Sequence, residues 1–273
     1  GAQTSCSSYN PSNMGNASIP SGGSGGNIEY QWQYKTTGGW NNIGSSNSAT
    51  YDPSTISITT QYQRGVRRNG CSTYIYTGSI TKAVDALPVI SAPVNQTLCD
   101  TSSFTMAQST SVGSGVWTVV SSTGTAPTIT DNNSATTTVT GLPAGKSAIL
   151  RWTVTNGTCS ISDDVSIQND AQIIADNTTT TIAINEDQTK TLTGSPSGGS
   201  WSIVSGGGTI NGSTYKPADI NTDTTVTISY TIAADGDCVA TSDAVTFTVT
   251  PVDLCSDGAT VGLVTANDRD ADG

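Results

Sequence analysis

The sequence predicts an all-β fold built from tandem β-sandwich modules in an extended array. The main observation behind this prediction is that a tryptophan is followed by a cysteine at a similar spacing three times along the chain. The pairs are separated by 39, 42 and 37 residues, and they are Trp32 and Cys71, Trp117 and Cys159, and Trp201 and Cys238. Each tryptophan follows a Gly/Ser-rich turn. No segment has a helical period, and turn residues recur about every 8–12 positions, as in β-sandwiches.

The composition excludes several classes of partner. The 273 residues carry 10 Lys+Arg against 21 Asp+Glu, a net charge of −11, so we expect no nucleic acid and no anionic membrane as a partner. No run of about 18 apolar residues exists, so we expect no direct membrane insertion. Only 11% of residues are charged, and the polar surface must come from Ser, Thr, Asn and Gly, which suit strands and turns.

The six cysteines predict disulfides rather than a metal site. They show no Cys-x-x-Cys spacing and the chain has no histidine, which makes zinc ligation improbable. An even number of widely spaced cysteines indicates disulfide bonds and an oxidising compartment. We therefore expect an exported protein, in the periplasm, at the cell surface or in the medium.

Module one is predicted to span residues 1–86. A core strand covers Tyr30 to Tyr34, with Trp32 on its inner face. After the turn at Gly38-Gly39, a second strand covers Ala49 to Pro53. A further strand runs from Gln61 to Arg68 and leads to Cys71. Gly65 is expected to mark a bulge there, and Tyr74 and Tyr76 suggest a last strand.

Modules two and three are predicted over residues 87–170 and 171–252. Leu87-Pro88 marks the first boundary, because proline holds the preceding residue in an extended conformation. The two modules share a pattern of three strands. In module two the strands hold Trp117 and Val119, then Leu150 to Val154, then Val165 and Ile167; in module three they hold Trp201 and Ile203, then Val226 to Ile232, then Val245 to Val249.

The cysteine positions suggest one disulfide within each module. Cys6 with Cys71 would close module one, and Cys99 with Cys159 would close module two. Each closes a loop of about 60 residues, worth roughly 4 kcal/mol in the chain-entropy model. Module three lacks a leading cysteine, so Cys238 is paired with Cys255, unless Cys255 bonds beyond Gly273.

The last residues, 253–273, contain the one ion-binding motif. Asp268, Asp270 and Asp272 alternate and are followed by Gly273, which is the opening half of a calcium loop. Ca²⁺ is the only cofactor expected. Calcium binding is favoured for this motif in an intact protein, whereas this chain alone is expected to bind the ion weakly or not at all. The alternative is an acidic, disordered tail.

Catalysis has little chemical basis in this sequence. Gly22-Gly23-Ser24-Gly25-Gly26 formally fits the pattern G-x-S-x-G, but no histidine exists to activate the serine. Asp163 and Asp164 are adjacent, so in a strand they face opposite ways and would not act on one substrate. We therefore expect no enzymatic activity and assign no catalytic residue.

Two groups of side chains in module one are weak candidates for ligand binding. Trp40, Tyr74 and Tyr76 could form an aromatic platform for sugars, although packing at a core or rim is the favoured interpretation. Arg64, Arg67 and Arg68 form the only basic cluster, for which a solvated strand surface is favoured over contact with an acidic glycan.

The residues also resemble a known class of repeats. Tyr30 to Gln33, Trp40 to Ile43, Ala49 to Pro53 and Tyr62 to Cys71 look like the Ig-like repeats of Bacteroidota surface proteins. Modules two and three resemble the PKD-like repeats of the same proteins, through the strands given above. Residues 253–273 are similar to the start of a thrombospondin type 3-like calcium segment.

The resemblance implies the stalk of a large cell-surface adhesin, exported by type IX secretion, of the kind used in gliding motility (SprB-like). Its expected partners are a surface polysaccharide or protein substratum, neighbouring modules of the same protein, and the outer-membrane secretion machinery. Two alternatives stay open: a carbohydrate-binding accessory region of a secreted hydrolase, and a subunit of a self-assembling extracellular fibre.

Overall fold

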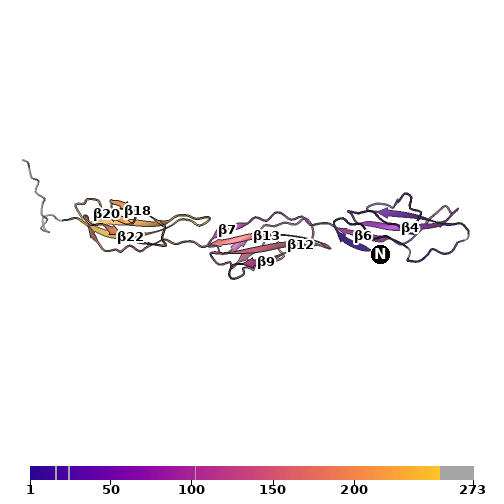
Figure 1. Cartoon of the computed structure of the whole chain (residues 1–273), viewed down its shortest axis with the longest axis horizontal. Coiled ribbons are helices and arrows are strands. Elements are labelled where there is room, and N and C mark those ends of the chain that lie inside the picture. Colours follow the sequence, from indigo (N-terminus) through magenta and orange to yellow (C-terminus); the bar gives the residue numbers. More distant parts are fainter. Residues whose placement is uncertain (16, 24, 102, 253–273) are drawn as a thin grey trace, which may run out of the picture. The chain divides into compact units, whose positions relative to one another are not determined.

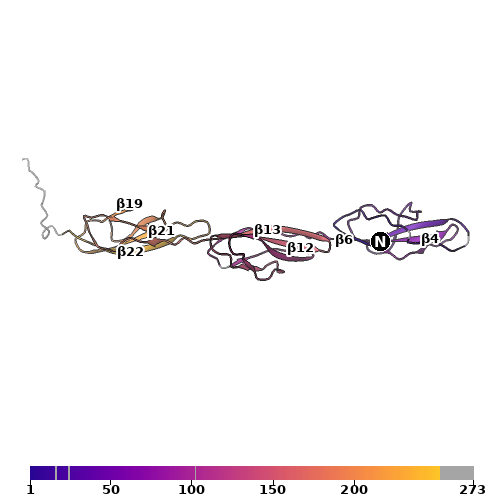
Figure 2. The ribbon, with the colours of Figure 1, turned by 60° about the horizontal axis from the view of Figure 1, so that its bottom comes forward.

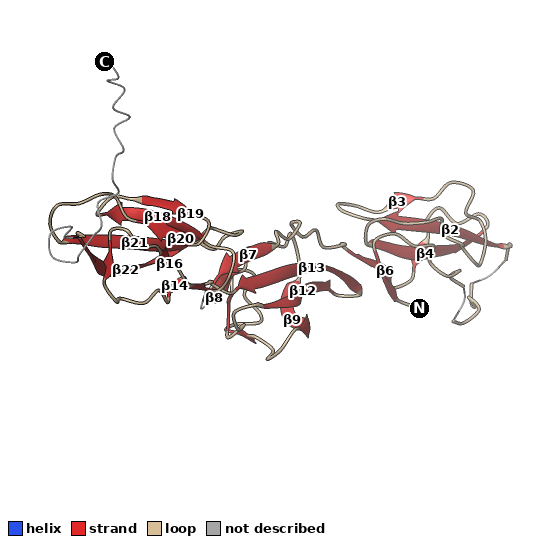
Figure 3. Cartoon of the chain, turned by 60° about the vertical axis from the view of Figure 1, so that its left-hand side comes forward, coloured by secondary structure: helices blue, strands red, loops and turns tan. Residues whose placement is uncertain are grey.

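The structure, a computed structural model, describes residues 1–15, 17–23, 25–101 and 103–252. Its elements are β-strands joined by loops, with no helix among the described residues (Figures 1 and 3). The chain divides into two compact units, residues 1–169 and residues from Asp170 onward. The strands form three groups, which we call the first, second and third modules. The all-β prediction is confirmed, and the exact boundaries after residues 86 and 170 stay predictions.

The first module has one large sheet in the order β1-β6-β4-β2-β3, with β5 paired to β4. Strand β1 runs parallel to β6, whereas β4 is antiparallel to both β2 and β6. Its core is small and contains Met14, Trp32 and Tyr62. The strands are β1 (Gln3–Cys6), β2 (Ile28–Lys35), β3 (Asn41–Asn42), β4 (Thr60–Arg68), β5 (Ile75–Tyr76) and β6 (Ile80–Asp85).

Three details of the first module differ from the prediction. The strand expected at Ala49 to Pro53 is reduced to one bridge between Tyr51 and Met14. The last strand is β6, which lies beyond the tyrosines. Gly65 keeps the regular register opposite Gln31, so the predicted bulge is wrong. The glycine is needed instead because the Tyr76 ring lies over it, with its nearest atom 2.7 Å from where a Cβ would stand.

Strand β6 was missed because its inward side chain is a lysine. Lys82 is fully buried, and its ammonium group donates to the Gly1 carbonyl at 2.9 Å and to the Gln3 side chain at 2.7 Å. Burial lowers the pKa of Lys82. An isolated buried ammonium would be costly, so the two acceptors on and before β1 are what allow this strand to pack.

The second module is a sandwich of two sheets, ordered β7-β13-β12-β9 and β10-β11-β8. The inner faces supply a core that includes Trp117, Leu150, Trp152, Val154 and Ile167. The predicted alternation along residues 150–154 is therefore confirmed. The strands are β7 (Gln96–Cys99), β8 (Ser103–Thr105), β9 (Ser114–Ser122), β10 (Thr128–Ile129), β11 (Thr138–Thr140), β12 (Lys146–Asn156) and β13 (Cys159–Asp170).

The hairpin of β12 and β13 is the longest element of this module (Figure 2). Its register runs without interruption from Lys146 opposite Asn169 to Asn156 opposite Cys159. Period-2 alternation along both strands fixes this register, because a slip of one residue would turn every core side chain outward. The hairpin therefore places Cys159 at the tip of a rigid ribbon.

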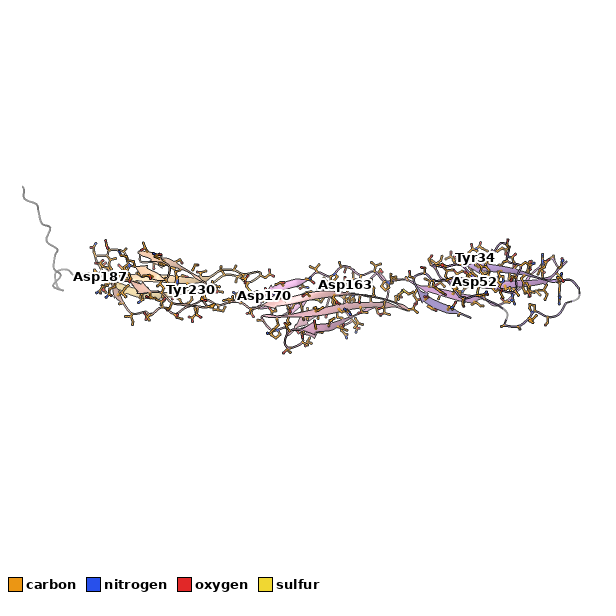
Figure 4. The ribbon with its side chains drawn as sticks, viewed as in Figure 1. Tyr34, Asp52, Asp163, Asp170, Asp187 and Tyr230 are labelled. Atoms are coloured by element: carbon orange, nitrogen blue, oxygen red, sulfur yellow. A yellow bond between two sulfur atoms is a disulfide. The ribbon has the colours of Figure 1, made fainter. Side chains whose placement is uncertain are left out.

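The third module has sheets β15-β22-β21-β18, β16-β20-β19 and β14-β17. Tyr230 of β21 (Figure 4) packs against Trp201, with ring centroids 4.5 Å apart. The strands are β14 (Asp176–Asn177), β15 (Ile184–Asn185), β16 (Lys190–Thr191), β17 (Gly194–Ser195), β18 (Ser200–Ser205), β19 (Thr209–Asn211), β20 (Thr214–Lys216), β21 (Thr224–Ile232) and β22 (Thr241–Thr250).

Candidate functional site

A disulfide joins the first module to the second. Cys6 at the end of β1 is bonded to Cys159 at the start of β13, with Cα atoms 4.8 Å apart and 153 residues between them in sequence. Cys71 is free and exposed. The predicted pairings Cys6 with Cys71 and Cys99 with Cys159 are therefore wrong, because the Cys6–Cys159 bond links two modules instead of closing one.

Strand directions explain why Cys6 cannot reach Cys71. Cys6 is level with Asp85 at one end of the sheet. Strand β4 pairs with β6 near Thr60 and then runs eight residues the other way, to Arg68. At about 3.3 Å per residue this places Cys71 more than 25 Å from Cys6, whereas a disulfide needs Cα atoms within about 7 Å.

Cys99 is equally far from Cys159. Two residues after Cys99, the Thr101 backbone N–H donates to the Asn169 side chain at 2.9 Å. Asn169 lies ten residues along β13 from Cys159, which is about 33 Å of strand. Cys99 and Cys238 are each disulfide-bonded. Cys255, the partner predicted for Cys238, lies outside the described residues.

Asp85 forms the polar part of the joint between the first two modules. Its carboxylate accepts hydrogen bonds from the Thr158 backbone N–H at 2.7 Å and from the Thr158 hydroxyl at 2.9 Å. The Asn156 side chain donates to the Ala86 carbonyl at 2.8 Å. Hydrogen bonds to an ionised acceptor are stronger than those between neutral groups. The turn of the β12–β13 hairpin is therefore bound firmly to the end of β6.

Gly157 allows this close approach. It adopts a φ of 57°, and a Cβ at this position would collide with the Asp85 carboxylate. Both the left-handed backbone and the lack of a side chain are therefore required here. Cys159 Sγ lies 3.3 Å from the Asp85 carbonyl oxygen, which brings the disulfide and the carboxylate into one compact contact.

The same combination of an aspartate, a turn glycine and a cysteine recurs in the unit that begins at Asp170. Asp170 ends β13 (Figure 4), as Asp85 ends β6, and its carboxylate lies 3.5 Å from where a Cβ of Gly236 would stand. Gly236 also has a φ of 57°. Cys238 Sγ lies 3.7 Å from the Ala171 carbonyl oxygen. An aspartate, a turn glycine and a disulfide-bonded cysteine thus meet twice in this chain.

The sequence contained a signal for this arrangement. The leading cysteines end similar tetrapeptides, Gln3-Thr4-Ser5-Cys6 and Gln96-Thr97-Leu98-Cys99. The later cysteines each close a four-residue turn, and these turns are Arg68 to Cys71, Asn156 to Cys159 and Asp235 to Cys238. Comparing these positions between modules, instead of pairing cysteines within one, would have indicated the joint.

The three arginines of the basic cluster bind groups of the same chain. Arg64 is buried, lies over the rings of Tyr30 and Trp32, and donates to the Ala49 carbonyl at 2.8 Å. The prediction of a solvated surface is therefore wrong for Arg64. Arg67 forms a 2.7 Å ion pair with Glu29, and the hydrogen bond to that carboxylate raises the pKa of Arg67.

We expect Arg64→Met to lower the free energy of unfolding by about 1–3 kcal/mol, because the Ala49 carbonyl loses its charged donor. Arg68→Met is the matched control. Arg68 donates to the carbonyls of Gly22 and Gly26 at the exposed surface, so its loss should cost less than about 1 kcal/mol. Chemical denaturation measures both, and equal costs would contradict the structural role of Arg64.

A groove of about 520 Å³ lies beside this cluster. Its lining includes Ile28, Val66, Arg67, Cys71, Ile75 and Tyr76. Ile75 is 79% exposed, unusual for a large apolar side chain within a strand. The groove therefore combines apolar surface, the guanidinium groups of Arg64, Arg67 and Arg68, of which Arg67 is paired with Glu29, and a free thiol.

The predicted aromatic platform is not assembled as one row. Tyr74 and Tyr76 are neighbours, with ring centroids 6.3 Å apart. The Lys35 ammonium group instead lies over the Trp40 ring, 5.0 Å from its centroid. The Lys35 backbone pairs with Gln61, whereas the Tyr76 backbone pairs with Gly65. Four residues of β4, about 13 Å, separate the two places. Sugar binding by these residues stays a prediction.

Other expected sites are not described by the structure. Asp268, Asp270 and Asp272, the predicted calcium ligands, lie outside the described residues, as does Ser24. Among the described residues there is no group of three or more His, Cys, Asp or Glu side chains that could hold a metal ion. Over the same part of the chain, no helix is long and apolar enough to cross a membrane. Asp164 forms an ion pair with Arg151, and Asp163 accepts from the Asp164 N–H.

Comparison with known proteins finds a family model of unknown function that matches part of the chain, and a common fold. Residues 1–86 match the model of a domain of unknown function (DUF8696). No curated protein matches the sequence. Among solved structures, the N-terminal eight Ig domains of Down Syndrome Cell Adhesion Molecule align over 92% of this chain and 36% of theirs, with a TM-score of 0.50 and 11% identity.

Two three-domain fragments also align. Titin domains I67–I69 cover 83% of this chain and 88% of their own, with a TM-score of 0.45 and 12% identity. Extracellular domains 3–5 of Drosophila OTK cover 83% and 87%, with a TM-score of 0.40 and 13% identity. The alignment with the cell adhesion molecule shows the fold alone: this chain consists of tandem Ig-like β-sandwich modules.

Proposed function

We propose that this chain is a structural stalk of a bacterial cell-surface adhesin, which spaces and stiffens the protein and presents an adhesive part to a substratum. The observation that carries the proposal is the joint between the first two modules. The Cys6–Cys159 disulfide and the hydrogen bonds of Thr158 to the Asp85 carboxylate hold the end of β6 against the β12–β13 hairpin. A binding module does not need its neighbour fixed in this way, whereas a stalk that transmits force does.

The chemistry of the chain supports an extracellular place for this stalk. Disulfides persist in oxidising compartments and are rare in the cytosol. The resemblance to Bacteroidota repeats adds the finer part of the proposal: a type IX-secreted surface adhesin that acts in gliding or attachment, with a polysaccharide or protein substratum as partner. Calcium bound by Asp268, Asp270 and Asp272 would belong to the segment that follows the third module.

The carbohydrate-binding alternative has less support. It needs an exposed row of aromatic side chains, and Trp40 lies apart from Tyr74 and Tyr76. Tyr74 is also engaged, since the Arg67 guanidinium lies 4.4 Å from its ring centroid.

Pulling a single chain by its two ends tests the mechanical role. The Cys6–Cys159 bond prevents the 153 residues between the two cysteines from extending under force. The contour length gained on unfolding should therefore be at least about 500 Å smaller for the oxidised chain than for the reduced chain. Cys71→Ser should extend like the unaltered chain, because its thiol is free. Equal lengths for oxidised and reduced chains would contradict the proposal.

A further inference from the structure

Cys71 occupies the position that carries the inter-module disulfide in the second module. It is the fourth residue of the turn that follows β4, and its N–H bonds to the Arg68 carbonyl at 3.0 Å. Cys159 is the fourth residue of the turn that follows β12, opposite Asn156. Both β4 and β12 lie inside their sheets, with a strand on each side. The two cysteines therefore occupy the same place relative to their sheets, although the turn glycine is the third residue, Gly70, in the first module and the second residue, Gly157, in the second.

The corresponding cysteine is bonded in both other modules. Cys159 is bonded to Cys6 of the module before it, and Cys238, which also closes its turn, is disulfide-bonded. In each case the cysteine sulfur lies against the carbonyl of a residue at, or just after, the end of a preceding strand, Asp85 or Ala171. Cys71 alone among the three is a free and exposed thiol.

Cys71 lies at the end of the first module that the known joint does not use. Strand β6 runs toward Asp85 and the second module, and β4 runs the opposite way toward Cys71. One end of this module thus presents Cys6 and Asp85, and the other end presents a turn with a cysteine. The module has the two halves of the joint, one at each end.

The surface around Cys71 fits the end of another such module. The groove beside it is lined by Ile75 and Val66, which would be covered on docking, and by Arg67 and Arg68. In the known joint the docked end carries an aspartate, Asp85, next to its cysteine. A strand that ends in aspartate is attracted to guanidinium groups. The positive charge of Arg67 and Arg68 near Cys71 therefore complements the negative charge of this partner.

We propose that the turn at Cys71 is the receiving half of a second joint of this kind. Its partner is a further Ig-like module whose first strand ends in Gln-Thr-x-Cys and whose last strand ends in aspartate, joined ahead of β1 in the same chain. The two thiols form a disulfide and lose two protons and two electrons, which reduce a disulfide oxidant such as oxidised glutathione to two thiols. The inference rests on the joint and not on an adhesive role, so its failure would leave the proposed function standing.

A duplication of the first module tests this directly. Residues 1–95 are placed ahead of residues 3–273, so that Asn95 of the added copy is followed by Gln3-Thr4-Ser5-Cys6 instead of Gln96-Thr97-Leu98-Cys99. The linker then has its natural length. The protein is folded with reduced and oxidised glutathione, alkylated without reduction, and mapped by peptide mass spectrometry.

We expect a bond between Cys6 of the added copy and Cys71 of the original, with both thiols lost to alkylation. The original Cys6–Cys159 bond, in the same molecule, reports that the modules have folded. In a matched duplication that carries Cys71→Ser in the original copy, Cys6 of the added copy should be alkylated. Free thiols at both positions beside an intact Cys6–Cys159 bond, or a Cys71–Cys71 bond between two chains, would overturn the proposal.

A second measurement needs no duplication. In the protein taken from its native cell surface, the peptide that holds Cys71 should be disulfide-linked to a Gln-Thr-x-Cys peptide. Its recovery as a free thiol would overturn the proposal in the natural protein, whatever the duplicated protein does.

Discussion

Replacing Cys6 and Cys159 together by serine is expected to lower the free energy of unfolding of residues 1–169 by up to about 5 kcal/mol. The bond closes a loop of 153 residues, and the chain-entropy model gives this value at 25 °C. Much of the effect acts on the unfolded chain, which gains freedom when the link is removed. The loss is comparable to the whole stability of many domains.

Guanidinium unfolding of the full chain measures this loss, and Cys71→Ser is the matched control. Since Cys71 is free and exposed, its replacement should change the unfolding free energy by less than about 0.5 kcal/mol. The opposite ranking, with Cys71→Ser as costly as the double replacement, would favour a disulfide inside the first module and would contradict the joint.

Gly115→Val is expected to destabilise the second module by about 3 kcal/mol or more. The Trp152 ring occupies the place where a Cβ at Gly115 would stand. Trp152 is almost fully buried and packs against Trp117, with ring centroids 5.2 Å apart, so it has no free space to move into. Overpacking a tight core forces side chains out of their rotamers, and this position requires displacement of a whole indole.

Ser114→Val, one residue earlier in β9, is the control for the extra side chain itself. Ser114 is exposed, so its replacement should change stability by less than about 0.5 kcal/mol. Thermal and chemical unfolding of both variants provide the comparison. A loss below about 1 kcal/mol for Gly115→Val would show that the Trp152 ring does not lie where the structure places it.

The strands of the second and third modules could be predicted because local patterns agree there with the fold. Period-2 alternation placed Leu150, Trp152 and Val154 on one face, and all three are buried. In both modules a glycine is required two residues before the tryptophan, for the same structural reason. Gly115 lies under the Trp152 ring and Gly199 lies under the Tyr230 ring. These positions repeat in sequence because the same ring packing repeats in space.

The first module was harder to predict because charged side chains take inward positions. Arg64 and Lys82 break the apolar alternation of β4 and β6, and both are buried. Their partners are carbonyls and an amide from distant parts of the chain, such as Ala49, Gly1 and Gln3. A pattern of period two contains no information about such acceptors, so the strand β6 was missed and the role of Arg64 was misjudged.

The disulfide prediction failed for a different reason. It assumed that two cysteines of one module bond across its core, as in many Ig-like domains. Strand direction excludes this, because Cys6 and Cys71 lie at opposite ends of the sheet. That exclusion depends on the parallel pairing of β1 with β6, which no local pattern in residues 3–6 indicates.

The disulfide map of the non-reduced protein tests the joint most directly. Trypsin cuts after Lys35, Arg68, Lys82 and Arg151, among other sites, and so places Cys6, Cys71, Cys99 and Cys159 on four separate peptides. The structure predicts one linked pair that contains Cys6 and Cys159, with Cys71 alkylated without prior reduction whenever no further module is joined ahead of β1. A map that instead links Cys6 to Cys71, or Cys99 to Cys159, would contradict a covalent joint between the modules and with it the stalk built on that joint.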